Sequence, residues 1–266
     1  FFLGSAPIDP AGIDDMRNYL SNTRNIGFYQ ATRERFSSVG ALEAGLTNAF
    51  KHLKYHYPSV RMPRVYSYIS GGDYDFPVRF ADTVLIIGLD NYLGSDFEPY
   101  RSDGLPVYRT ARMTADHILP DCMKRFADAL HPAAEPANNL LGQMVEAGKR
   151  LYFIDAMIPA TDDRFKAGYT VDQQAWIEKN EKHVWATMIE HQMLYSTDGP
   201  LIRTFLADGP FTAEFSQEAP PRLGEWIGWQ IVRRYMEKNP GITIPALMAE
   251  RDAQKILSMS GYKPEK

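Results

Sequence analysis

The chain has 266 residues and a formal net charge of −4, with 44% hydrophobic and 23% charged residues, which is the composition of an ordinary globular protein. The charges are well mixed along the sequence, so no basic stripe or polybasic run favours nucleic-acid phosphates or anionic lipid, and we expect no nucleic-acid partner. The longest apolar run, residues 84–89, has the length of a strand and is too short to span a bilayer.

The single cysteine, Cys122, excludes a disulfide within the chain and a cysteine-based zinc site. A lone cysteine acts as a nucleophile only when a histidine and an orienting group lie close to it. Cys122 lies inside a helical pattern, and we therefore expect a buried, unreactive thiol.

The sequence begins with Phe1 and Phe2 and has no initiating methionine, which indicates a processed or truncated product. A signal peptide or a lipidated cysteine would then have stood upstream of residue 1. The sequence therefore permits export but does not demonstrate it.

The first half of the sequence predicts helices followed by strands. Residues 10–20 begin with a proline, which is common in a first helical turn, and residues 41–57 carry apolar side chains at helical spacing. Residues 64–69 alternate in the manner of a strand, and the short apolar segments 77–80 and 83–89 follow them. We expect these three segments to form a small mixed sheet.

From residue 105 onward the pattern is almost wholly helical. Apolar spacing predicts helices at residues 107–130, 137–147, 171–195, 224–239 and 245–259. Pro120 is expected to interrupt the first of these, and Gly148 is expected to end the second as a C-terminal cap. The chain has no internal repeat and no low-complexity linker, so the sequence predicts one mostly helical α+β domain over residues 1–266.

His117 and Asp121 come nearest to a zinc-peptidase motif. They are four residues apart, so they would share one face of a helix, and Glu146 follows as a third possible ligand. A catalytic zinc helix has the motif His-Glu-x-x-His, in which the glutamate takes a proton from the metal-bound water. Ile118 stands where that glutamate would be, and Pro120 disturbs the helix that would orient the pair. We therefore expect polar pocket or surface residues here, with no catalytic residue and no metal.

Two other pairs of residues could take part in chemistry. Glu190 precedes His191 on a long predicted helix, as in some general acid–base pairs, and His52 and His56 have the spacing of two metal ligands. We interpret the first pair as part of a half-exposed helix face and the second as solvated, because lysines flank it. The sequence contains no nucleophile-elbow serine, phosphate-binding loop or dinucleotide fingerprint.

Residues 221–236 contain two glycines and two tryptophans at helical spacing, which is typical of a helix packed closely into a core. This segment resembles the helix Gly-x-Trp-x-Gly-Trp-x-x-Val-x-x-Tyr near the C-terminus of the GldB family of gliding-motility lipoproteins. Segments 87–94, 190–205 and 256–264 resemble the same family in the same order. The residues that we assign to its motifs, in structural roles, are Asp90, Tyr92, Gly94, Gly224, Trp226, Gly228, Trp229, Arg233 and Tyr235.

The resemblance implies an exported lipoprotein of the cell envelope. Such a protein would face the periplasm or the cell surface and touch the membrane only through an N-terminal lipid anchor. The resemblance also implies a zincin-like fold, in which His117 and Asp121 take the places of two metal-binding histidines and Glu146 lies in the segment of the third ligand. These three residues form a candidate vestigial pocket without a metal.

The resemblance and the missing zinc motif together favour a non-catalytic envelope protein, associated with gliding motility or envelope machinery, that binds a protein or peptide partner. Two alternatives stay open. One is an atypical metallopeptidase-like hydrolase, and the other is a glycan-binding envelope module that uses the abundant aromatic side chains. We expect no cofactor: one histidine with two carboxylates is a possible but unusual set of zinc ligands, and we do not expect zinc to bind there.

Overall fold

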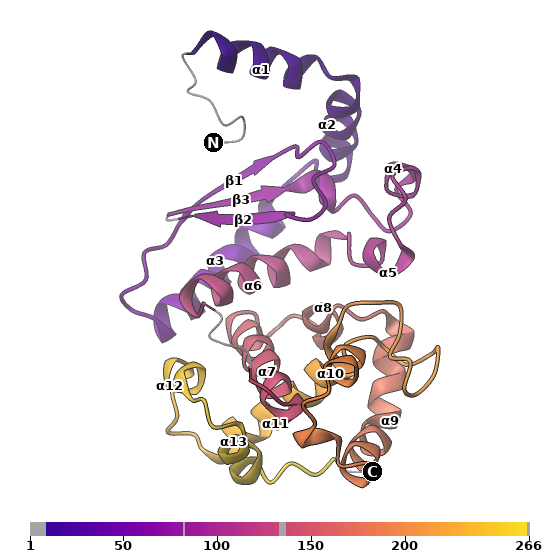
Figure 1. The fold of residues 1–266 in the computed structure, drawn as a ribbon. Helices are drawn as coiled ribbons and strands as arrows, with labels where there is room; N and C mark the ends of the chain where they lie inside the picture. The colour runs from indigo at the N-terminus through magenta and orange to yellow at the C-terminus, as the bar shows by residue number, and fades with distance from the viewer. Residues whose placement is uncertain (1–8, 82, 133–136, 265–266) are drawn as a thin grey trace.

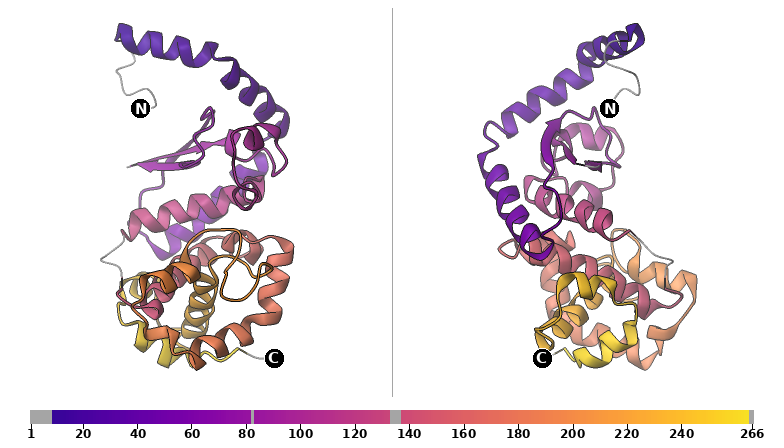
Figure 2. Two further views of the ribbon diagram at one scale, coloured as in Figure 1. Left: turned by 45° about the vertical axis from the view of Figure 1, so that its right-hand side comes forward. Right: turned by 90° about the vertical axis from the view of Figure 1, so that its left-hand side faces the viewer.

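The computed structural model describes residues 9–81, 83–132 and 137–264 and has the mostly helical α+β arrangement that the sequence predicts. Figure 1 shows two helices at one end, a small sheet with helices beneath it, and a helical second half. The views in Figure 2 show the same succession, with the N-terminal helices farthest from the C-terminal half. In the described part of the chain, no helix is both long and apolar enough to cross a bilayer.

Side-chain caps begin both N-terminal helices. α1 (Pro10–Ser21) starts after Asp9, and α2 (Thr23–Arg35) starts after Asn22; in each case the capping side chain accepts a hydrogen bond from an amide of the first turn. α1 agrees with the predicted helix. Sequence patterning does not predict α2, because only two of its residues are buried and it has no apolar stripe.

The three strands of the sheet lie in the order β1 (Arg64–Tyr68), β3 (Val84–Gly88) and β2 (Val78–Ala81). The central β3 pairs parallel with β1 and antiparallel with β2, which confirms the predicted mixed sheet. α3 (Gly40–His56) and α6 (Ile118–Leu130) lie beneath the sheet in Figure 1. Their apolar sides and the inner side chains of β3 belong to one continuous core.

A buried carboxylate anchors the turn that follows β3. Asp90 accepts hydrogen bonds from the Ser70 amide at 2.7 Å, the Ser70 hydroxyl at 2.8 Å and the Gly71 amide at 2.9 Å. Gly94, a little further along, has a φ of +124°, which favours glycine, and its amide donates to the Met113 carbonyl at 3.0 Å. Asp90 and Gly94 therefore shape the loop that leads away from the sheet.

The prediction of one helix over residues 107–130 is wrong. After the short elements η1 (Leu89–Asn91) and α4 (Glu98–Ser102), this region divides into α5 (Val107–Thr110), η2 (Ala115–His117) and α6. Pro120 does not interrupt α6, because it is the third residue of the helix and first-turn amides have no acceptor within the helix. The break lies earlier, between α5 and η2.

The second half consists of helices joined by loops. Its described elements are α7 (Leu140–Met157), α8 (Asp163–Ala167), α9 (Val171–Glu190), η3 (Met193–Tyr195), α10 (Gly199–Leu206), α11 (Leu223–Lys238), α12 (Ile244–Ala249) and α13 (Ala253–Ser260). The predicted helix 171–195 corresponds to α9 and η3, and the predicted last helix is two helices, α12 and α13. The prediction that Gly148 ends a helix is also wrong, because α7 continues past it.

Gly148 has a packing role instead, in the main helix–helix contact of this half, between α7 and α11. A Cβ on Gly148 would lie 2.2 Å from the carbonyl carbon of Gly228, so the two helices can approach only where both positions are glycine. Trp226 and Trp229 are buried, as expected, and their rings meet edge to face with centroids 5.5 Å apart. Nε1 of Trp226 donates to the Glu181 carboxylate on α9 at 2.7 Å.

Candidate functional site

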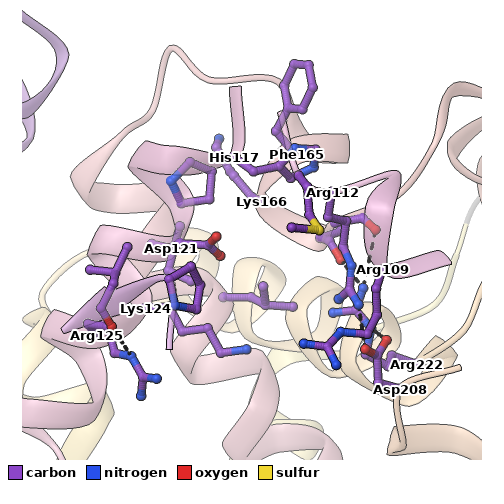
Figure 3. Close-up of a pocket in the computed structure, with 18 of the residues that line it drawn as sticks. Arg109, Arg112, His117, Asp121, Lys124, Arg125, Phe165, Lys166, Asp208 and Arg222 are labelled. Atoms are coloured by element: carbon purple, nitrogen blue, oxygen red, sulfur yellow. Dashed lines mark hydrogen bonds and ion pairs between the residues drawn. The ribbon is translucent and has the colours of Figure 1, made fainter. Parts of the chain in front are cut away.

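A cavity of about 650 Å³ lies between the sheet layer and the helical half (Figure 3). Its wall comes from the start of β2, the segment around α5, α6, the middle of α7, α8 and the start of α11. Because these elements belong to both halves of the chain, a ligand in the cavity would contact both halves at once.

Basic side chains dominate the charge of the wall. Among the described residues, seven basic side chains line it: Arg109, Arg112, Lys124, Arg125, Arg150, Lys166 and Arg222. Four carboxylates line it as well: Asp75, Asp121, Asp208 and Glu225. In Figure 3 the labelled arginines 109, 112 and 222 gather on one side, while Lys124 and Arg125 lie on the other. We call the first group the arginine side.

Aspartates partly occupy the arginine side. Nη2 of Arg112 lies 2.5 Å from one oxygen of Asp208, and Nε of Arg222 lies 3.5 Å from the other. Nη2 of Arg109 lies 3.0 Å from the Asp75 carboxylate. Arg222 is held further by donation from its Nη2 to the Ala167 carbonyl at 2.7 Å. The three guanidinium groups are therefore fixed in place before any ligand arrives.

The opposite group, which we call the lysine side, consists of Lys124, Arg125 and Arg150. Lys124 is exposed, and within the described part of the chain it makes no hydrogen bond or ion pair. Arg125 donates to the Val78 carbonyl at 3.1 Å, and it shares the Asp128 carboxylate with Arg150 at 3.8 Å from each. These long contacts leave most of the donor capacity of the lysine side unused.

His117 lies on the cavity wall and is buried. Nδ1 is 2.9 Å from the Thr114 hydroxyl, Nε2 has no hydrogen-bond partner among the described residues, and Phe165 meets the ring edge to face. Burial, together with the smaller effect of the positive charges of Arg112, Arg164 and Arg222, lowers the pKa of His117 to about 4. The imidazole is therefore neutral at pH 7, and its buried Nε2 is left without a partner among the described residues.

Asp121 lies one helical turn after His117, at the start of α6. The Tyr92 hydroxyl donates to its carboxylate at 2.8 Å. Burial raises the pKa of Asp121, while this hydrogen bond and the charges of Lys124 and Arg112 oppose the rise. Tyr92 is buried and itself lines the cavity, so this residue assigned to a family motif holds the Asp121 carboxylate on the cavity wall.

The structure brings together two of the three residues of the candidate vestigial pocket. His117 and Asp121 line the same cavity, whereas Glu146 is not on its wall. The Glu146 carboxylate lies 2.6 Å from Nζ of the buried Lys149 and 3.6 Å from Arg251. Over residues 9–81, 83–132 and 137–264, no group of three or more His, Cys, Asp or Glu side chains is arranged to hold a metal ion.

Arg233, another residue assigned to a family motif, joins α11 to α7 and α8. Its guanidinium donates to Asp155 at 2.7 Å and to Asp163 at 2.8 Å, and it lies over the Trp229 ring at 3.8 Å from the centroid. Lys166, almost fully buried, donates to the same Asp155 carboxylate at 2.6 Å. This network fixes α8, which carries Lys166 and Phe165 to the cavity wall.

Sequence patterning did not predict the basic lining. Its members are spread from residue 109 to residue 222, so no window of the sequence contains a basic cluster. The local signals are two close pairs of basic residues, Arg109 with Arg112 and Lys124 with Arg125. Glu190 and His191, by contrast, are exposed at the end of α9, away from the cavity.

Together the fold and cavity define a mostly helical α+β protein with a cationic cavity between its two halves. Residues 2–264 match the family described as gliding motility protein GldB, and the chain therefore belongs to the GldB family. This confirms the resemblance seen in the sequence. Membership points to a gliding-motility-related protein of the cell envelope, in a family whose name marks its members as lipoproteins. No curated protein and no solved structure matches the chain.

Proposed function

We propose that this chain is the folded body of a lipid-anchored envelope protein that serves gliding motility, or related envelope machinery, by binding a partner protein or peptide. The single observation that carries the proposal is the cationic cavity between the two halves of the chain. Arg109 and Arg222 are held in place by the carbonyls of Tyr74 and Ala167, so that binding would cost little ordering of these side chains.

The chemistry of the wall supports binding rather than catalysis. His117 has a pKa of about 4 because it is buried, which makes it a poor base at pH 7, and Glu146 lies outside the cavity. Burial raises the pKa of the Cys122 thiol well above its usual value, so little thiolate is available as a nucleophile. The zincin-like fold that the family resemblance implies is part of this proposal, and superposition of an experimental structure on zinc peptidases would test it.

Replacement of the native gene by cavity variants tests the proposal in the bacterium that encodes the chain. Lys124→Glu combined with Arg150→Glu reverses two charges on the lysine side, and we expect colony spreading and single-cell gliding to be lost while the protein level stays normal. Lys51→Glu makes a like change on the exposed surface of α3, off the cavity wall, and should glide as wild type. Normal gliding of the double variant would contradict a binding role for the cavity.

The lipid anchor is tested separately. Cells that express the full-length precursor are labelled with a palmitate analogue and fractionated. We expect the labelled protein in the membrane fraction. An unlabelled protein in the soluble fraction would contradict the lipid anchor, and the proposed role of the cavity would be unaffected.

A further inference from the structure

We propose that the cavity receives an acidic peptide segment of the partner, and that Asp208 is an internal carboxylate which occupies part of this site until the segment binds. The inference rests on the proposed function, because it names the chemistry of the partner. Each side of the cavity would bind a carboxylate of the segment, and Asp208 competes for the position on the arginine side.

The arginine side already binds a carboxylate of the chain itself. Asp208 contacts Arg112 through one oxygen and Arg222 through the other, at 2.5 and 3.5 Å. Its side chain is 42% exposed, and it belongs to the loop between α10 and α11. A carboxylate from outside can therefore reach the same two guanidinium groups if Asp208 is displaced, and paired donors of this kind suit carboxylates.

The lysine side offers further positive charge with few internal partners. Lys124 has no ion pair among the described residues, and Arg125 and Arg150 have only the shared Asp128 at 3.8 Å. A second carboxylate of the same ligand would be attracted there. Because the two sides lie apart in Figure 3, the ligand must be extended and carry more than one negative charge.

The rest of the wall favours a peptide over a phosphate. Four carboxylates line the cavity together with the seven basic groups, and they repel any anion that lies close to them. A peptide whose carboxylates are spread apart can place them against the basic groups and away from the wall carboxylates, which a compact phosphate cannot do. A peptide also supplies N–H groups, and these carboxylates can accept hydrogen bonds from them. His117 also lines the cavity, and its buried Nε2 has no hydrogen-bond partner among the described residues, so a peptide group that moved into contact with the ring would satisfy it.

Fluorescence anisotropy with the purified chain tests the proposal. The probe is a fluorescein-labelled hexaglutamate peptide, and a hexaglutamine peptide of the same length serves as the neutral comparison. We expect saturable binding of hexaglutamate that weakens as salt is raised, no saturable binding of hexaglutamine, and no displacement by inorganic phosphate at equal charge concentration. Equal binding of both peptides, or displacement by phosphate, would overturn the acidic-peptide assignment.

Variants locate the binding. Lys124→Glu with Arg150→Glu should weaken hexaglutamate binding by about tenfold or more, whereas Lys51→Glu should leave it unchanged. Wild-type affinity of the double variant would overturn the assignment of the cavity. Circular dichroism melts of each variant show whether a loss of binding comes from unfolding.

Asp208→Asn is the sharper test, because the proposal predicts a gain. Removing the internal carboxylate breaks the close ion pair of Arg112 and the longer contact of Arg222, which keeps its pair with Glu225. Hexaglutamate should therefore bind about threefold more tightly or better. Glu43→Gln removes one negative charge on the exposed surface of α3 and controls for net charge. Weaker binding by Asp208→Asn would mean that Asp208 only positions the arginines, and it would overturn the competition.

The binding assay tests the acidic-peptide inference, and the gliding assay tests the proposed function, so one can be contradicted while the other stands. If hexaglutamate does not bind but the cavity double variant still abolishes gliding, the acidic-peptide inference falls and the proposed function stands. If hexaglutamate binds in the cavity and the double variant glides normally, the proposed function falls and the chemistry of the site stands.

Discussion

Gly148 on α7 and Gly228 on α11 meet backbone to backbone. A Cβ on Gly228 would lie 1.9 Å from the carbonyl oxygen of Met144, and a Cβ on Gly148 would lie 2.2 Å from the carbonyl carbon of Gly228. α7 supplies Arg150 to the cavity wall, and α11 begins directly after Arg222. The close crossing of these helices therefore fixes the separation of Arg150 and Arg222, which lie on opposite sides of the cavity.

Gly228→Ala should destabilise the protein by about 3 kcal/mol, because the added methyl group meets backbone atoms that cannot move aside as a side chain can. Urea unfolding followed by circular dichroism measures the change. The matched control is Gly27→Ala on α2, where a Cβ meets nothing within 4 Å. This control should be neutral or slightly stabilising, by up to about 1 kcal/mol. An equal change in the free energy of unfolding for the two variants would contradict the close contact between α7 and α11 at Gly228.

Trp229→Ala should cost about 3–5 kcal/mol, since the side chain is fully buried and its removal leaves a large cavity in the core. Thermal melting monitors the loss. Tyr55→Ala, at a ring that is 79% exposed on α3, should change the free energy of unfolding by less than about 0.5 kcal/mol. An unchanged melting temperature for Trp229→Ala would show that this tryptophan belongs to a surface.

Asp155→Ala should destabilise the protein by about 3 kcal/mol, because it leaves Lys166 and Arg233 with Asp163 as their shared carboxylate. The buried side chain of Lys166 makes this loss larger than that of a surface pair. Asp14→Ala breaks the exposed pair with Arg17 and should cost less than about 1 kcal/mol. Chemical denaturation of both variants at one pH decides between the two magnitudes.

The stability of the protein should fall with acidification through His117. A histidine in the unfolded chain has a pKa of about 6.5, whereas burial lowers the pKa of His117 in the folded chain to about 4. Between these values the unfolded state binds the additional proton, so the free energy of unfolding decreases as the pH falls, by up to about 3 kcal/mol. His117→Gln removes this contribution.

Urea unfolding of wild type and His117→Gln at pH 7 and at a pH near 4.5 measures the difference. We expect a smaller loss of stability for the variant across this interval. The comparison is made between the two proteins, because Asp121 acts in the opposite sense: burial raises its pKa, so its contribution favours the folded state as the pH falls. Equal losses in both proteins would contradict the neutral, buried state of His117.

The sequence alone determined those helices and strands whose apolar pattern can be read within a single short segment. Side chains at strand or helix spacing identified α1, α3, the three strands and α11, because an amphipathic pattern reports which face of one element is buried. The family was recognised from the same kind of local information, in the segment that contains Trp226 and Trp229. Burial of these two tryptophans followed directly from their spacing.

Only the tertiary structure decided the roles that depend on contact between distant segments. Gly148 looked like a helix end because the sequence does not show Gly228 packed against it. Glu146 looked like a partner of His117, but the buried Lys149 takes its carboxylate. The basic cavity is invisible in the sequence for the same reason: its charges come from separate elements, and the electrostatic field of a wall depends on distances in space and not on positions along the chain.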